Sequence, residues 1–363
     1  MTNETLLLVK NLKVYFETYE GTVKALEDVS FEIHVGETVG LVGETGCGKS
    51  VTALAVMRLI PDPPGKIVNG EVWFNNENLL LKSNEEMQKI RGKDISMIFQ
   101  EPMTALNPTY TIADQIAEVI LLHEMPKNNE KKFLDKLNFI KKRYQQKKIK
   151  KIVEEKVIDV LKMVKIPNPE TVAKQYPHEL SGGMRQRVMI AMMLACNPKL
   201  LIADEPTTAL DVTIQAQILE LVKDLQKNTN ASIWLITHDL GIIAEMCNNV
   251  GVMYAGYITE FGDTKTIFKW PYHPYTQGLM KAIPKITEKR EKLDIIPGSV
   301  PNLISPPSGC RFHPRCNYAT DICKKAPPPL NEVEPGHFVA CYRYEDVKYA
   351  LIPNNKKEEK RNE

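Results

Sequence analysis

Residues 43–50 contain the feature that most limits what this chain can fold into. They read Gly-Glu-Thr-Gly-Cys-Gly-Lys-Ser, a G-x-x-x-x-G-K-S pattern, between a β-type run at 37–42 and a helix-forming run at 50–59. In this strand, loop and helix order, consecutive backbone N–H groups and the helix N-terminus can surround a phosphate group. The pattern therefore predicts an α/β fold with a phosphate-binding loop after a strand.

Each part of this loop has an expected role at a bound nucleotide. Lys49 is expected to reach the β- and γ-phosphates, and Ser50 is expected to ligate Mg²⁺. Cys47 has no chemical task in the pattern, and we expect a small filler that reagents could alkylate. The remaining residues expected to contact the nucleotide are Gly43, Glu44, Thr45, Gly46, Gly48 and Val51.

Two carboxylates follow a second buried strand. Residues 199–204 are apolar up to Asp204, and Glu205 comes next. The C-terminal edge of an open α/β sheet is where ligands bind, so both carboxylates are expected at that edge. Asp204 is expected to hold Mg²⁺ through water, and Glu205 is placed to polarise an attacking water.

Gln100 and His238 complete the predicted catalytic set. Gln100 ends the run 95–99 and could sense the γ-phosphate, Mg²⁺ or the attacking water. His238 follows the apolar strand 232–237 and could contact the γ-phosphate and orient that water. A polar strand end and a structural histidine are the alternatives, and the neighbouring motifs favour the catalytic roles.

A second potential anion site lies at residues 180–186, which read Leu-Ser-Gly-Gly-Met-Arg-Gln and precede a helix-forming run ending at residue 195. Ser181 is a good N-cap, and a helix start offers free N–H groups to an anion. Nothing in the sequence requires that this anion be bound to the same chain.

The order and spacing of these motifs resemble those of the ATP-binding subunits of ABC transporters, over about residues 6–266. The resemblance implies a P-loop NTPase core with an antiparallel β-subdomain and a helical subdomain. It also implies a head-to-tail dimer with a homologous subunit, in which Ser181 and Gly183 touch the γ-phosphate of the partner's ATP. Phe16 would stack on the adenine, and Asp211 would link the two sites.

We expect the ATPase cassette to comprise residues 1–266, and its hydrophobic pattern predicts two subdomains. Residues 6–35 alternate as antiparallel strands around a hairpin near residues 20–21, and residues 70–74 continue that β-subdomain. A mainly helical subdomain is expected at about residues 101–190. By resemblance, residues 101–108 would contact the membrane subunit.

A lysine-rich insert at residues 127–151 contains eleven Lys or Arg residues. A solvated helix with one apolar stripe is the leading interpretation. Contact with a membrane surface or acidic partner, and nucleic-acid binding, are the alternatives.

Four cysteines cluster near the C-terminus in a proline-rich segment: Cys310, Cys316, Cys323 and Cys341. A cytosolic protein is not expected to rely on disulfides, so a metal site is favoured. Their spacing lacks the paired knuckles typical of zinc. An iron–sulfur cluster, Zn²⁺ and unmetallated buried thiols remain as alternatives. His313 and His337 lie nearby and are expected to be surface residues.

The same segment resembles the C-terminal part of oligopeptide and dipeptide importer ATPases, through residues 273–276, 296–298, 301 and 309–316. The resemblance implies a [4Fe–4S] cluster on the four cysteines. We expect residues 267–350 to form a small cysteine-rich domain and residues 351–363 to form a disordered tail.

Composition and hydropathy indicate where in the cell the protein is expected. The net charge of +2 argues against bulk attraction to nucleic acid, and no apolar run approaches the ~18 residues that span a bilayer. No signal peptide is apparent. A peripheral position on the cytoplasmic face of the membrane is therefore expected.

The combined prediction is an ATPase subunit that powers import of oligopeptides or dipeptides. Its expected partners are a homologous ATPase subunit, two transmembrane permeases and an extracytoplasmic peptide-binding protein. The alternatives are the ATPase of an importer for nickel or another small solute, a soluble ABC ATPase acting on ribosomes or DNA, and an iron–sulfur enzyme of nucleic acids.

Overall fold

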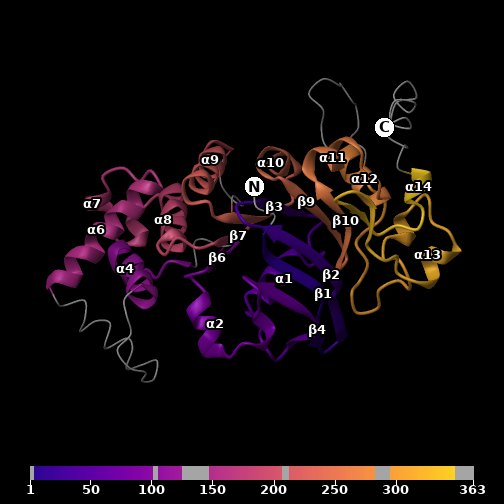
Figure 1. Cartoon of the computed structure of the whole chain (residues 1–363), viewed down its shortest axis with the longest axis horizontal. Coiled ribbons are helices and arrows are strands. Elements are labelled where there is room, and N and C mark those ends of the chain that lie inside the picture. The colour runs from indigo at the N-terminus through magenta and orange to yellow at the C-terminus, as the bar shows by residue number, and fades with distance from the viewer. Residues whose placement is uncertain (1–3, 101–104, 125–146, 207–211, 283–294, 348–363) are drawn as a thin grey trace. The chain divides into compact units, whose positions relative to one another are not determined.

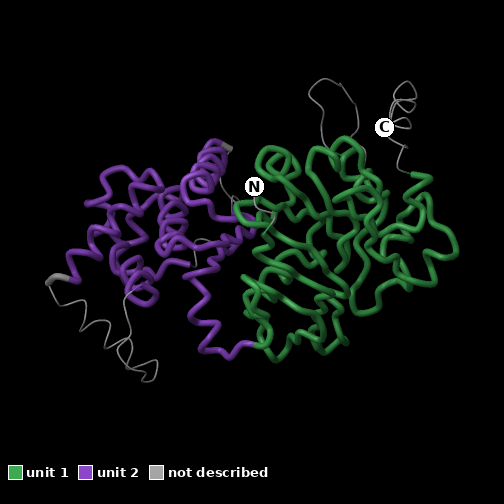
Figure 2. The backbone as a smooth tube through the Cα atoms, in the orientation of Figure 1, with its two compact units in different colours: residues 1–81, 234–363 green, residues 82–233 purple. Residues whose placement is uncertain are grey.

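The computed structural model describes residues 4–100, 105–124, 147–206, 212–282 and 295–347. Contacts divide the chain into two compact units, residues 1–81 with 234–363, and residues 82–233 (Figure 2). The predicted small C-terminal domain, residues 267–350, belongs to the first unit. Among the described residues, the contacts therefore do not separate a C-terminal domain from the phosphate-loop core.

The first unit is built mainly of strands, with short helices (Figure 1). Its strands are β1 (Thr5–Thr18), β2 (Gly21–His34), β3 (Thr38–Val42), β4 (Gly65–Phe74), β5 (Glu77–Asn78), β9 (Asn249–Tyr254), β10 (Tyr257–Asp263), β11 (Asn331–Glu334) and β12 (His337–Val339). Its helices are α1 (Lys49–Val56), η1 (Leu79–Leu81), α10 (Leu240–Met246), α11 (Thr264–Lys269), α12 (Pro274–Ala282), η3 (His313–Arg315), α13 (Asp321–Lys325) and α14 (Tyr344–Val347).

The second unit is mainly helical (Figure 1). It contains α2 (Asn84–Ile90), β6 (Ile95–Ile98), α4 (Ile112–His123), α6 (Lys147–Met163), α7 (Pro169–Val172), η2 (Pro177–Glu179), α8 (Gly182–Leu194), β7 (Leu200–Asp204) and α9 (Val212–Thr229). The chain passes from this unit into the first within β8 (Ser232–Ile236).

The N-terminal strands form the antiparallel β-subdomain that the alternating sequence predicts. β1 pairs with β2 on one side and with β4 on the other. The turn between β1 and β2 is closed by Thr18, whose hydroxyl donates to the carbonyl of Gly21 at 2.7 Å. In β2, Val29, Phe31 and Ile33 are buried at alternate positions, as period-2 burial against a core requires.

The strand predicted before the phosphate loop is confirmed as β3. All five of its residues are buried, and it pairs in parallel with β9. Burial on both faces is typical of a parallel strand and explains the unbroken apolar run. Helix α1 is shorter than predicted and ends at Val56. Arg58 has a φ of 50°, and this left-handed conformation, followed by Pro61, ends the helix.

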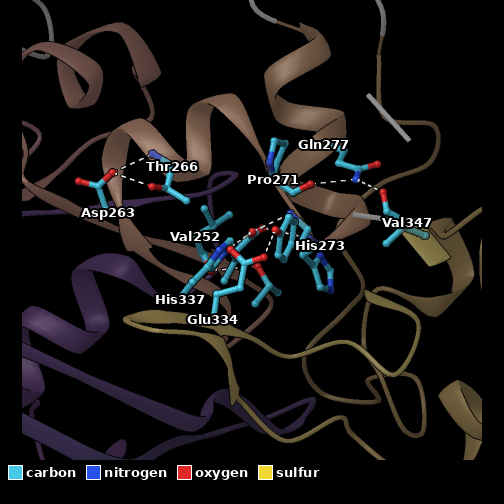
Figure 3. A network of polar contacts seen from close by, with 12 residues as sticks. Val252, Asp263, Thr266, Pro271, His273, Gln277, Glu334, His337 and Val347 are labelled. Atoms are coloured by element: carbon cyan, nitrogen blue, oxygen red, sulfur yellow. Dashed lines mark hydrogen bonds and ion pairs between the residues drawn. The ribbon is translucent and has the colours of Figure 1, made fainter. Parts of the chain in front are cut away.

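The C-terminal segment is continuous with the sheet because β12 pairs antiparallel with β10. Within that pairing Glu260 lies opposite Val339, and its carboxylate is fully buried. It accepts hydrogen bonds from the backbone N–H groups of Tyr272 and His273 and contacts His337 Nε2 at 2.8 Å (Figure 3). The prediction that His337 lies on the surface is wrong, because this contact and stacking against Tyr272 bury its ring.

A second link in the same region joins α12 to the end of the described chain. The amide of Gln277 donates to the carbonyls of Pro271 and Val347, at 2.9 and 2.7 Å (Figure 3). Buried polar groups of this kind need partners, so the segment is fixed to its own unit by satisfied hydrogen bonds as well as by apolar contacts.

In the second unit, β6 and β7 pair in parallel, with Ile95 opposite Leu200. Helices α4, α6 and α8 pack against one another. Of the lysine-rich insert, residues 127–146 lie outside the described residues, and residues 147–151 begin α6. Across the described ranges of both units, none of the helices is long and apolar enough to cross a bilayer.

Candidate functional site

The phosphate loop of the first unit is closed by its own lysine. Lys49 is the first residue of α1, and its side chain is buried. Its ammonium donates to the carbonyls of Gly43 and Glu44, at 2.8 and 3.1 Å. The charge is thus held inside the loop, where a phosphate oxygen could replace these acceptors.

Two positions of the loop require glycine because other atoms of the protein lie very close to them. A Cβ on Gly43 would lie 2.1 Å from the carbonyl oxygen of Met253. Gly48 caps α1 with a φ of 107°, and a Cβ there would lie 2.6 Å from Leu26. No other residue fits either position without moving backbone or core side chains.

Glu44 is held from the C-terminal segment by two residues that sequence reasoning missed. The hydroxyl of Tyr275 accepts from the backbone N–H of Glu44 at 3.0 Å. The Arg315 guanidinium lies 3.0 and 3.1 Å from the two carboxylate oxygens of Glu44. These partners are 231 and 271 positions away in sequence, so no local pattern could identify them.

Cys47 differs from its prediction. The side chain is fully buried, and burial raises the pKa of its thiol. The reactive species of cysteine is the exposed thiolate, so alkylation in the folded protein is not expected. Its role as a small filler inside the loop is consistent with this burial.

In the second unit, two of the predicted catalytic residues meet. The amide Nε2 of Gln100 donates to Oε2 of Glu205 at 3.0 Å. Asp204 ends β7 and is buried. Glu205 has a φ of 47°, so the chain turns sharply directly after the strand. A non-glycine residue in this region costs free energy and is typically retained at functional sites.

Ser181 caps α8, the helix of the signature segment, which is defined here as residues 180–186. Its hydroxyl accepts from the N–H of Met184 at 3.4 Å. A Cβ on Gly182 would meet no atom within 4 Å, whereas one on Gly183 would lie 3.2 Å from Ile214. The helix start is exposed at Ser181 and Gly182. Farther along the helix, Gln186 is buried and donates to the carbonyl of Pro206.

The other predicted residues lie as follows. His238 is exposed and follows Thr237, whose N–H donates to the carbonyl of Leu41 in β3 at 3.3 Å. Phe16 lies in β1 and is half-buried. Asp211 and residues 101–104 of the expected membrane-subunit contact lie outside the described residues.

The structure brings the four C-terminal cysteines to one cavity. Cys310, Cys316, Cys323 and Cys341 line it together with Phe312 and other side chains, and its empty space, including the part open to solvent, is about 320 Å³. Burial raises the pKa of the Cys310 thiol to about 11 and that of Cys341 to about 12. Without a metal these thiols stay protonated at neutral pH, so a metal would have to displace their protons.

The four thiols are not arranged as a compact site for a single metal ion. In the part of the chain that the structure describes, no three or more His, Cys, Asp or Glu residues are arranged to hold one metal ion. Tetrahedral zinc requires sulfur atoms about 2.3 Å from the metal. Thiolates ligate both zinc and iron–sulfur clusters, so the four side chains have donor chemistry that suits either group.

Comparison with known proteins agrees with this arrangement of motifs. The family described as ABC transporter matches residues 26–208, and the family described as oligopeptide/dipeptide transporter, C-terminal region, matches residues 259–323. A dipeptide transport ATP-binding protein of Bacillus subtilis is 46% identical over 98% of this chain and 100% of its own length. An oligopeptide transport ATP-binding protein of Escherichia coli is 46% identical over 94% of each chain.

Solved structures give the same fold. A dimeric bacterial ABC transporter cassette superposes with a TM-score of 0.57 at 25% identity, covering 71% of this chain and 99% of that chain. A post-hydrolysis dimer of the same cassette, bound to ADP and inorganic phosphate, matches equally well.

Proposed function

This chain belongs to the family of ABC transporter ATP-binding proteins, and from that premise we propose that it is the ATP-hydrolysing subunit of an importer for dipeptides or oligopeptides. The observation that carries the proposal is the presence, on one chain, of both the cassette match and the peptide-transporter C-terminal match. Relatives whose names specify dipeptide or oligopeptide transport match along nearly the whole chain. This favours a peptide over nickel as the transported solute.

The residues divide the work of hydrolysis. Lys49 binds phosphate oxygens in place of the loop carbonyls that it now contacts. Glu205 polarises the attacking water, and Gln100 orients the Glu205 carboxylate through their hydrogen bond. His238 orients the water against the γ-phosphate, and Phe16 stacks on the adenine.

Ser50, Asp204 and Gln100 would supply oxygen ligands to Mg²⁺, because hydroxyl, carboxylate and amide oxygens are its preferred ligands. When bound, the ion would neutralise developing charge on the phosphate oxygens.

The partner supplies the rest of the site. Ser181 and Gly183 begin an exposed helix N-terminus, which would bind the γ-phosphate of ATP held by a second, homologous subunit. Asp211 would link the two sites across that dimer. Two membrane permeases and an extracytoplasmic peptide-binding protein would complete the importer, with this chain on the cytoplasmic face. Residues 1–266 would form the ATPase cassette.

The catalytic assignment is tested by Glu205→Gln. This variant should bind ATP normally, lose at least about 100-fold in turnover and accumulate as a closed dimer with ATP. Equilibrium binding, phosphate release in the assembled transporter and size-exclusion chromatography measure the three effects. Glu220→Gln, an exposed change on α9, is the matched control. Normal turnover in Glu205→Gln would refute the role of this carboxylate.

The physiological assignment is tested by affinity purification of the tagged chain from solubilised membranes. Recovery with two polytopic membrane proteins and a second cassette is the expected result. Recovery with ribosomes or DNA instead would support a soluble ABC ATPase and contradict the importer.

For the four-cysteine cavity, we infer that Cys310, Cys316, Cys323 and Cys341 hold a [4Fe–4S] cluster. Support comes from the four thiols, which line one cavity. The cluster would cross-link a segment that has little regular structure. The cluster would thereby stabilise the C-terminal region, residues 267–350, within the first unit.

Purification without oxygen tests the cluster. The protein should be brown and contain about four iron atoms per chain, and Cys316→Ser should lower the iron content. Cys196→Ser, which changes a cysteine outside the cavity, should leave the iron content unchanged. Colourless protein with stoichiometric zinc, or with four free thiols, would contradict the cluster.

A further inference from the structure

The C-terminal segment contacts the phosphate loop through two side chains outside every motif of the cassette. We propose that Arg315 and Tyr275 are positioning residues that hold Glu44, and with it the phosphate loop, in the conformation that receives nucleotide. The proposal rests on the ATPase function proposed above. It assigns a part in nucleotide binding to a region that otherwise lacks one.

Contacts other than the one to Glu44 hold the Arg315 side chain in place. Its side chain is 7% exposed, against 29% for that of Glu44. The Nε group donates to the carbonyl of Pro297 at 2.9 Å, and Nη2 donates to the carbonyl of Ile296 at 3.2 Å. Its guanidinium also lies over the ring of Tyr254. Nη1 donates to both carboxylate oxygens of Glu44 and also to the Tyr254 hydroxyl at 3.3 Å. With all of these donors engaged, the pair is a rigid contact rather than a surface ion pair.

Tyr275 acts on the backbone of the same residue. Its hydroxyl accepts from the N–H of Glu44, while Lys49 donates to the carbonyl of Gly43. The N–H and the C=O belong to one peptide unit, which is therefore held from both sides. The Tyr275 ring is fully buried against Tyr254 and Phe312, with ring centroids 4.7 and 5.4 Å away.

These contacts should matter for ATP in two ways. If the loop also samples conformations that cannot bind nucleotide, its apparent affinity falls in proportion to the fraction of molecules in the binding conformation. In addition, Glu44 places a negative charge in a loop that binds a polyanion, and Arg315 neutralises that charge. Loss of Arg315 would therefore both loosen the loop and leave an unpaired carboxylate beside the phosphates.

The first experiment compares two buried arginines on the purified full chain by fluorescence titration with an ATP analogue. Arg315→Met should weaken nucleotide binding about tenfold and should raise the KM for ATP more than it lowers kcat in the assembled transporter. Arg311→Met is the matched control. Arg311 also fixes the C-terminal segment, through Glu27 and the carbonyls of Lys24 and Ala255. If the role of Arg315 were only structural, both variants would lose affinity equally, and that result would overturn the proposal.

The second experiment tests whether Arg315 acts through Glu44. Adding Glu44→Gln to Arg315→Met should recover part of the lost affinity, because the unpaired charge is gone. Tyr275→Phe removes one oxygen and should weaken binding about threefold without unfolding the chain, so it remains informative if Arg315→Met does not fold. Wild-type affinity in both Tyr275→Phe and Arg315→Met would refute the proposal, whereas failure of the unaltered chain to bind ATP would instead refute the ATPase function.

Discussion

The phosphate loop and the signature segment are both helix starts offered to phosphate, but the chain builds them differently. The loop is closed by Lys49 and held by Tyr275 and Arg315 from far along the sequence. In the signature segment, Ser181 caps its own helix, and a Cβ on Gly182 would meet open space. One helix start is organised by distant parts of its own chain, and the other is left accessible.

The difference indicates how each binds its anion. A loop held by distant residues is preorganised, so it can bind nucleotide without a partner. An exposed, locally capped helix start has free N–H groups and little around it to exclude water. It is suited to a phosphate brought by another subunit. Changes at the loop should therefore affect the isolated chain, whereas changes at the signature segment should affect only the assembled transporter.

Ser181→Arg should give the largest difference in effect between the isolated chain and the assembled transporter. The bulky cation should block the helix start and lower hydrolysis in the assembled transporter by at least about 100-fold, while ATP affinity of the isolated chain stays unchanged. Phosphate release and nucleotide titration measure the two effects. Ser83→Arg, at the exposed N-cap of α2, is the matched control for loss of a cap. A comparable loss of affinity in isolated Ser181→Arg would break the comparison.

A pair of glycine substitutions compares how tightly neighbouring atoms pack around the phosphate loop and around the signature segment. Gly48→Ala should lower the free energy of unfolding by about 1–3 kcal/mol, because its φ is 107° and a Cβ would contact Leu26. Gly182→Ala should change it by less than about 0.5 kcal/mol, since the space is open. Chemical denaturation with probes in each unit measures both. Equal destabilisation would show that the signature segment is as tightly built as the loop.

Acid should weaken the first unit through His273. Burial lowers the pKa of this histidine to about 3, whereas the unfolded chain has the ordinary value near 6.5. Between these two pKa values the unfolded state binds more protons than the folded state. The contribution of His273 to the free energy of unfolding is therefore fully present above pH 6.5 and is lost as the pH falls. Going from pH 7 to pH 5 should cost about 2 kcal/mol through this group.

The measurement for His273 is the pH dependence of denaturant unfolding in the wild type and in His273→Gln. The variant should be less sensitive to acid in this range, since glutamine does not titrate. Identical slopes would mean that other groups cause the acid sensitivity.

Local motifs made much of the fold predictable. The strands before the phosphate loop and before Asp204 are found where the apolar runs predicted them. The N-terminal hairpin and the helix after Ser181 also agree with their patterns. These features depend on neighbours in sequence, on period-2 burial and on capping, which can be read along the chain.

The failures occurred where distant contacts decide the outcome. His337 carries no local sign of burial, yet Glu260 and Tyr272 enclose it. Cys47 was expected to be open to reagents, but the loop folds over it. The pairing of β12 with β10 is a further contact between distant residues that no local pattern indicates.

By itself, therefore, the sequence determined the chemistry available to this protein: a phosphate loop, a pair of carboxylates after a strand and a second helix start for anions. Only the tertiary structure decided what holds that loop, since the partners of Glu44 are Tyr275 and Arg315. Hydrogen bonds and ion pairs depend on distance in space and not on separation along the chain. A motif can therefore name the residues that meet a ligand but not those that support them.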